Sequence, residues 1–217
     1  RLLSLPQDRL PVNFSRAYIS GEGNNIDFEY GRIPLSVRKD ILKYLNRLIP
    51  NKYIIEKTDE FCKKFDEHTI SVNIRTWETE KRSTLFDIRN VYKVMDKKPK
   101  GAFFIVCDSP EILKQVKSRY IERVLVYPRR TFPGDRKSVE GIQDALIELL
   151  LLAKNKSLMV SYLSTFSEMA WWFGGCMARV EKIPVTFKGH LELAVEEIKA
   201  RMGNFFKKSY ISNGNNF

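Results

Sequence analysis

The apolar residues of this chain follow two kinds of pattern: short runs, some continuous and some interrupted by polar residues, and stripes that repeat every three to four residues. Runs of the length typical of strands occur at 70–74, 102–107, 123–127, 158–161 and 180–185. The run Ala102-Phe-Phe-Ile-Val-Cys107 is apolar throughout, which is typical of a strand covered on both faces. The pattern therefore predicts five strands in the interior of the molecule.

The stripes lie between these runs and predict amphipathic helices. They cover residues 36–48, 85–95, 110–120, 139–154, 165–177 and 191–202. Pro50 ends the first helix, and Ser109 followed by Pro110 is the pattern of a capped helix start. Because strands and helices alternate about five times, we expect an α/β fold: a mostly parallel, Rossmann-like sheet with helices on both faces.

The same pattern divides the chain into three parts. Residues 1–35 contain several prolines and a turn-rich stretch, which predicts an irregular lead-in. Residues 36–205 form the predicted domain, and 206–217 form a frayed tail. The chain starts without Met, so we expect it to lie within a longer polypeptide. Its longest aliphatic run, Leu149 to Leu152, is far short of the roughly 20 apolar residues that span a bilayer. The sequence is consistent with a location in the cytoplasm or in the lumen of the secretory pathway.

The charge and composition of the chain indicate which kind of ligand to expect. The 217 residues carry a formal net charge of +11, with a pI of about 9.5, which favours anionic ligands. The basic residues are spread along the chain, and the densest group lies at 129–137. This dispersion favours a small phosphate compound over nucleic acid. The three cysteines follow no CxxC spacing, and His68 and His190 are far apart, so we predict neither a disulfide framework nor a metal site.

Polar residues follow three of the predicted strands directly. Arg75 follows the first, Asp108 the second, and Ser161, Ser164 and Thr165 follow the fourth. In a parallel sheet the carboxyl ends of the strands meet at one edge, where ligands bind. A guanidinium suits phosphate oxygens, and a helix start rich in hydroxyls attracts anions. We therefore predict a phosphate site at that edge.

Simpler alternatives exist for each of these residues. Arg75 could form an ordinary salt bridge, Asp108 could cap the helix that follows it, and Ser164 or Thr165 could be plain helix caps. The loop at 129–137 is either a solvated basic turn or a segment that closes over phosphates. The pair Trp171 and Trp172 is expected in the core rather than as a stacking platform.

Three segments resemble motifs of the fucosyltransferases that use GDP-fucose, in the branch that holds the α1,2-, α1,6- and protein O-fucosyltransferases and the nodulation fucosyltransferase. Val72-Asn-Ile-Arg-Thr-Trp-Glu78 resembles V-H-(I/V)-R-R-x-D. Residues 104–113 are similar to a strand followed by (S/T)-D-D-x-x-x-L. Residues 147–155 with 161–170 are similar to the segment that ends in S-x-S-S-F-S-x-x-A. The likeness covers about residues 35–178.

The resemblance implies the C-terminal, donor-binding half of a GT-B glycosyltransferase, with the lead-in as a remnant of the acceptor-side domain. It implies an inverting, metal-independent transfer of fucose from GDP-fucose to a glycan or protein hydroxyl, with no cofactor. The residues carried over as donor-binding are Asn73, Arg75, Asp108, Ser164, Thr165 and Phe166, and their positions after predicted strands add Ser161 and, from the basic loop, Arg129. Of these, Arg75 would hold the diphosphate and Asp108 would contact guanine or ribose. The resemblance also implies that Arg75 is catalytic, and Glu78 or Glu80 is a candidate general base.

Three positions depart from the first motif: Asn73 replaces its His, Thr76 its second Arg, and Glu78 its Asp. Three alternatives follow. The first keeps the fold and the reaction but uses another deoxy-sugar donor, such as a rhamnose nucleotide. The second is a sugar-nucleotide-binding domain without catalysis. The third is a basic α/β domain that binds nucleic acid, although nucleic acid is not the expected partner.

Overall fold

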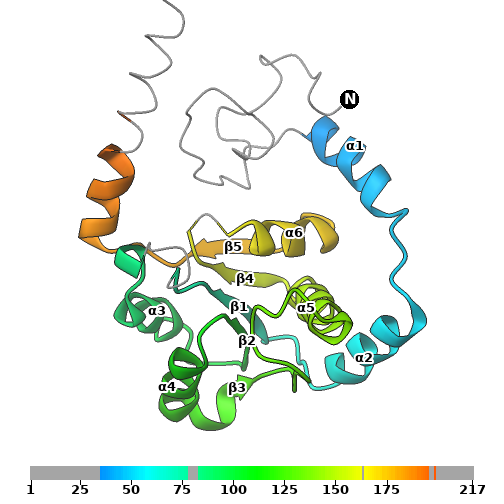
Figure 1. The fold of residues 1–217 in the computed structure, drawn as a ribbon, viewed down its shortest axis with the longest axis horizontal. Coiled ribbons are helices and arrows are strands. Elements are labelled where there is room, and N and C mark those ends of the chain that lie inside the picture. The colour runs from blue at the N-terminus through cyan, green and yellow to red at the C-terminus, as the bar shows by residue number, and fades with distance from the viewer. Residues whose placement is uncertain (1–34, 78–82, 163, 196–197, 199–217) are drawn as a thin grey trace, which may run out of the picture.

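Five strands form one parallel sheet in the computed structural model, which describes residues 35–77, 83–162, 164–195 and 198 (Figure 1). The order across the sheet is β3-β2-β1-β4-β5. The strands are β1 (Ile70–Ile74), β2 (Phe103–Cys107), β3 (Val124–Leu125), β4 (Ser157–Val160) and β5 (Arg179–Lys182). All four pairings are parallel, so the predicted α/β class is confirmed. The order reverses between β1 and β4, which makes their carboxyl ends a topological switch point.

Helices cover both faces of this sheet (Figure 1). They are α1 (Leu35–Leu45), α2 (Lys52–Cys62), α3 (Ile88–Met95), α4 (Pro110–Tyr120), α5 (Val139–Leu152) and α6 (Thr165–Phe173). Short 3-10 turns, η5 (Ser83–Leu85) and η6 (Ile121–Arg123), precede α3 and β3. Residues 187–195 are also helical. Helix α4 begins as predicted, because the Ser109 hydroxyl accepts from the Ile112 N–H and Pro110 occupies the first turn.

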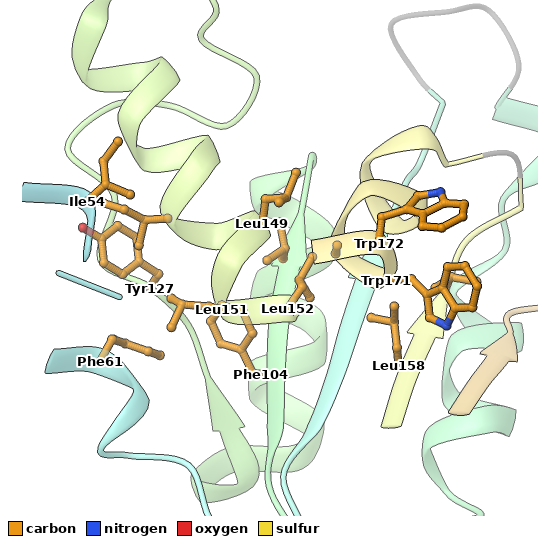
Figure 2. Close-up of a cluster of buried hydrophobic side chains, with 14 of the residues drawn as sticks. Ile54, Phe61, Phe104, Tyr127, Leu149, Leu151, Leu152, Leu158, Trp171 and Trp172 are labelled. Carbon is orange, nitrogen blue, oxygen red and sulfur yellow. The ribbon is translucent and has the colours of Figure 1, made fainter. Parts of the chain in front are cut away.

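The core consists of two apolar layers, one on each face of the sheet. Phe104 and Val106 of β2 face α2, α5 and α6 (Figure 2), while Phe103, Ile105 and Cys107 face α3 and α4. This alternation along one strand explains why the sequence of β2 is apolar throughout. Sequence neighbours thus serve opposite layers.

Helix α6 adds two large aromatic side chains to the first layer. Trp171 and Trp172 are 2% and 3% exposed, so the prediction that they belong to the core is confirmed. Their ring centres lie 5.1 Å apart in an edge-to-face arrangement. Among the described residues, no helix has both the length and the apolar composition needed to cross a bilayer.

Several predicted boundaries shift by a few residues. The strand expected at 123–127 is two residues long, and α6 ends at Phe173 instead of residue 177. After α6 the chain reverses through Gly175 (φ +68°) and Cys176 (φ +62°), which ends the helical geometry. Helix α2 has no counterpart among the predicted elements. The predicted lead-in up to residue 34, the tail and the end of the final helix lie outside the described residues.

Candidate anion-binding site

The carboxyl ends of β1 and β2, the start of α6 and the segment before α5 enclose a cleft of about 400 Å³. Seven of the predicted donor-site residues line it: Asn73, Arg75, Asp108, Arg129, Ser164, Thr165 and Phe166. Further lining residues come from the loop and from α5, namely Pro133, Gly134, Asp135, Arg136, Ala145 and Glu148. The structure thus brings together at one sheet edge residues that are spread over about ninety positions of the chain.

Arg75 is held from several sides. Its backbone N–H donates to the Ser161 hydroxyl at 2.8 Å, and its Nε lies 3.3 Å from Oδ2 of Asp108. Its guanidinium carbon lies 5.3 Å from the centre of the Trp77 ring. The side chain is 24% exposed, so the salt-bridge alternative is correct in part: Arg75 has an ion-pair partner and still lines the cleft.

Asp108 links the ends of β1 and β2. Besides facing Arg75, it accepts a hydrogen bond from the Thr76 N–H at 2.8 Å. The alternative in which Asp108 caps the following helix is wrong, because Ser109 occupies the cap position of α4. Asp108 therefore orients the arginine and the chain just after it. Thr76, at the position of the motif's second arginine, is uncharged and only 2% exposed, so it supplies no second positive charge to the cleft.

Asn73 joins β1 to the first turn of α6. Its Nδ2 donates to the hydroxyls of Ser164 and Ser167 at 2.8 and 2.6 Å. Ser164 is the N-cap of α6, since its hydroxyl also accepts from the Ser167 N–H at 3.3 Å. The cap alternative is therefore correct for Ser164, which lines the cleft as well. The free N–H groups of a first helical turn attract negative charge, so this end of the cleft favours an anion.

Ser161 has a different place from the other predicted residues. Its hydroxyl accepts from the Arg75 N–H and donates to the Asn73 carbonyl at 3.2 Å. It lines a much smaller cavity, shared with Tyr162 and Ile183. Ser161 therefore helps to build the sheet edge that carries Arg75.

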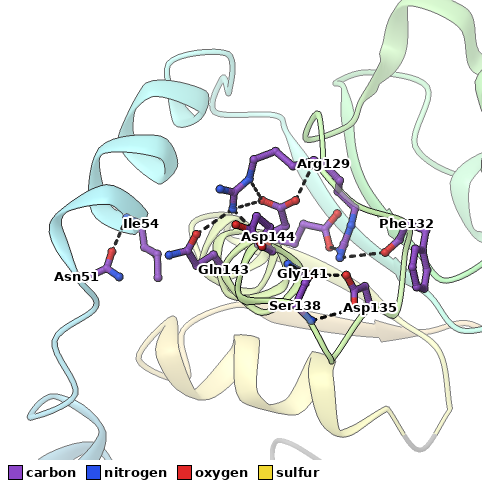
Figure 3. A network of polar contacts seen from close by, with 12 residues as sticks. Asn51, Ile54, Arg129, Phe132, Asp135, Ser138, Gly141, Gln143 and Asp144 are labelled. Carbon is purple, nitrogen blue, oxygen red and sulfur yellow. Dashed lines mark hydrogen bonds and ion pairs between the residues drawn. The ribbon is translucent and has the colours of Figure 1, made fainter.

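The basic loop before α5 forms one wall of the cleft, and Figure 3 shows the polar contacts that tie the loop to this helix. Asp135 accepts hydrogen bonds from the N–H groups of Lys137 and Ser138 at 3.0 and 3.2 Å. Ser138 then caps α5 by accepting from the Gly141 N–H at 2.9 Å. Gly134 adopts a positive φ of +84°, which favours glycine. The loop is therefore an ordered turn fastened to α5.

Glu148 of α5 is a site residue that the sequence analysis missed. It is 6% exposed and forms an ion pair with the guanidinium of Arg129, which is 12% exposed. Burial raises the pKa of the Glu148 carboxyl to about 7, although Arg129 opposes that shift. One turn earlier, the fully buried Asp144 binds Arg130 (Figure 3). The signal in the sequence was the presence of two acidic residues, Asp144 and Glu148, four positions apart in a helix that is otherwise largely apolar.

The proposed bases Glu78 and Glu80 lie outside the described residues. Trp77, just before them, has a positive φ of 62° and packs against Leu85 and Val185. Among the residues that the structure describes, no group of three or more His, Cys, Asp or Glu side chains is placed to hold a metal ion.

Fold and site together define an α/β domain with an arginine-lined cleft at the switch point of a parallel sheet. No family model and no curated protein sequence matches this chain. Solved structures do match. An α1,6-fucosyltransferase, NodZ, co-crystallised with GDP is 20% identical, with a TM-score of 0.42, over 55% of this chain and 41% of NodZ. The fucosyltransferase NodZ from Bradyrhizobium is 20% identical, with a TM-score of 0.42, over 64% of this chain and 46% of that one.

A variant of Arabidopsis thaliana FUT1 in complex with GDP is 17% identical, with a TM-score of 0.45. That match covers 72% of this chain and 38% of FUT1. The chain thus spans less than half the length of each of these proteins. The likeness is a distant one, of fold, over part of each molecule.

Proposed function

We propose that this chain is the donor-binding part of a glycosyltransferase, and that its cleft binds the diphosphate of a sugar nucleotide, with GDP-fucose the favoured donor. One observation carries the proposal: Arg75 after β1 and the Ser164-capped start of α6 line the same cleft at the switch point. Two of the three sequence motifs that resemble those of GDP-fucose-dependent enzymes contain these residues, since Arg75 lies in the first motif and Ser164 in the third.

The reaction proposed is inverting transfer of the sugar to a hydroxyl of a glycan or protein. As the bond between sugar and diphosphate breaks, negative charge develops on the leaving nucleotide. Arg75 and the N–H groups at the start of α6 would stabilise that charge where it forms. Glu78 or Glu80 would remove the proton of the acceptor hydroxyl. This chemistry requires no metal ligand from the chain.

Within this scheme Asp108 has a role different from the one the family motif implies. Because its two oxygens bind the Thr76 N–H and face Arg75, it is a positioning residue for the arginine. Its exposed fraction of 20% leaves it able to meet a ribose hydroxyl as well. Thr165 and Phe166 would approach the phosphates through their backbone N–H groups.

The proposal is tested by a thermal-shift panel of GDP, UDP, dTDP and their sugars, because a ligand that binds only the folded state raises Tm. GDP and GDP-fucose are expected to give the largest shifts. In Arg75→Ala the shift should fall to near zero, since the loss of one charged phosphate contact costs about 2 kcal/mol or more. Arg89→Ala is the matched control, because Arg89 is 82% exposed, pairs with Asp87 and is not among the residues that line the cleft.

A larger Tm shift with another deoxy-sugar nucleotide, such as a rhamnose donor, would mean that the chain uses that donor and would leave the proposed glycosyltransferase class unchanged. An unchanged GDP shift in Arg75→Ala would remove Arg75 from the site. If no nucleotide raises Tm at millimolar concentration, the proposed function is wrong.

A second candidate is a sugar-nucleotide-binding domain without catalysis. Two departures from the family motif favour it. The buried Thr76 replaces the second arginine of the motif, and Asn73 replaces the histidine and uses its amide group to donate to Ser164 and Ser167. Nucleotide binding without sugar transfer, in a longer polypeptide that includes the acceptor-side domain, would favour this candidate. Measurable transfer, lost in Arg75→Ala, would favour the enzyme.

A further inference from the structure

The cleft carries more internal charge pairing than an anion site needs. Arg75 faces Asp108 and Arg129 is paired with Glu148, while Asp135 is engaged by the loop N–H groups. Three arginines, including Arg136, and three carboxylates line the same space. An incoming diphosphate therefore meets a cleft in which two of the three arginines, Arg75 and Arg129, already have anionic partners.

The pairing of Arg129 leaves part of its guanidinium unused. A guanidinium has five N–H donors. One Nη binds Glu148, the other reaches the Phe132 carbonyl at 3.5 Å, and the buried Nε has no hydrogen-bond partner among the described residues. A buried donor without an acceptor is costly, so the guanidinium would gain from an arrangement in which this donor meets an oxygen, which the pairing with Glu148 does not provide.

Resting on the proposed function, we propose that Glu148 is a counter-anion that competes with the ligand's diphosphate for Arg129 and thereby sets how tightly the cleft binds anions. Arg129 would supply the second positive charge that Thr76 cannot. Glu148 holds this arginine in place while the cleft is empty and gives up part of the pairing when phosphate oxygens arrive.

The surroundings of Glu148 decide how it responds to pH. The charged and titratable groups near it are Arg129 and Tyr127 before α5, Asp144 one turn earlier on α5, and Arg130, which is paired with Asp144. The other charged residues that line the cleft are Arg75, Asp108, Asp135 and Arg136. Burial and Asp144 favour the protonated form of Glu148, and Arg129 favours the ionised form. A proton on Glu148 would weaken its hold on Arg129 and free the arginine for the ligand.

The test measures sulfate and GDP binding to the whole chain by calorimetry at about pH 8 and about pH 6. Sulfate is used because it stays a dianion over this range. Glu148→Gln should bind both ligands roughly threefold to tenfold more tightly than wild type at pH 8, because the ligand no longer competes with an ion pair whose contribution we take as about 1 kcal/mol. The gain should shrink at pH 6. In an Arg129→Met background the substitution should change nothing.

Glu140→Gln is the control for net charge, because Glu140 is an exposed residue of the same helix. If Glu148→Gln does not fold, wild type and Arg129→Met are compared instead. The sulfate affinity of wild type should rise from pH 8 to pH 6, and this rise should be absent in Arg129→Met. Weaker or unchanged binding by Glu148→Gln, or a pH response that persists in Arg129→Met, overturns the proposal. GDP binding no tighter than sulfate would instead contradict the proposed function while leaving the counter-anion intact.

Discussion

At the scale of single residues, the cleft depends on side chains whose partners lie far away in sequence. Asn73 occupies the position of a motif histidine, and its amide fastens α6 to β1 through two serine hydroxyls. Ser161 was predicted to meet phosphate, yet its hydroxyl bridges the backbones of Arg75 and Asn73. The sequence placed both residues near the site. It could not tell a lining group from a supporting one, since that depends on which donors and acceptors face each other after folding.

Glu168 makes a prediction about stability at this scale. It is 2% exposed, burial raises the pKa of its carboxyl to about 7, and the Trp172 indole donates to it at 3.3 Å. Because the folded state keeps the proton more tightly than the unfolded state, stability falls as pH rises from about 4.5 to about 7 and changes little above that. Glu168→Gln should therefore be more stable than wild type at pH 8, by up to about 3 kcal/mol.

Urea denaturation of both proteins at about pH 5 and about pH 8 checks this. The two proteins should have similar free energies of unfolding at pH 5, because the glutamate is then protonated in the folded state. A difference between them that does not depend on pH would contradict the pKa shift.

At the scale of elements, the start of α6 combines a structural and a functional role. Ser164 caps the helix, accepts from Asn73 and lines the cleft. Most elements were predictable because burial leaves a local pattern in the sequence, as in the apolar run of β2 and the regularly spaced apolar residues of α3. Helix α2 was missed because its inward stripe of Ile54, Thr58 and Phe61 includes a polar residue. The Thr58 hydroxyl donates to the Ile54 carbonyl at 2.8 Å, a partner that an apolar pattern does not reveal.

Ser164→Ala should lower both stability and nucleotide affinity. Loss of the cap and of an acceptor for the buried Asn73 amide is expected to cost about 1–3 kcal/mol. The GDP affinity should fall several-fold, because the first turn of α6 loses its anchor to β1. Chemical denaturation and calorimetry measure the two effects.

Ser109→Ala is the control for this variant. Ser109 caps α4 in the same way but does not belong to the cleft lining, so its loss should reduce stability and leave GDP affinity unchanged. Equal GDP affinities in the two serine variants would show that the start of α6 does not contact the ligand.

At the scale of the whole molecule, the charge of +11 is spread over the chain while the cleft itself is charge-balanced. A single bound nucleotide therefore forms only a few contacts between its phosphates and basic side chains. We expect GDP affinity to fall by less than about tenfold between about 50 and 200 mM salt, whereas a protein with many phosphate contacts loses about a thousandfold or more. Calorimetric titrations at several salt concentrations measure this slope. A steep slope together with binding to oligonucleotides would favour the nucleic-acid alternative.

The sequence by itself predicted five strands along the chain, the capped start of α4 and the convergence of Arg75, Asp108 and Ser164 on one sheet edge. These follow from local periodicity and from the rule that parallel strands end together. Only the tertiary structure decided that Asp108 orients Arg75, that Asn73 supports α6, and that Arg129 meets Glu148. Such pairings join segments up to ninety residues apart, and the packing of helices against the sheet selects them.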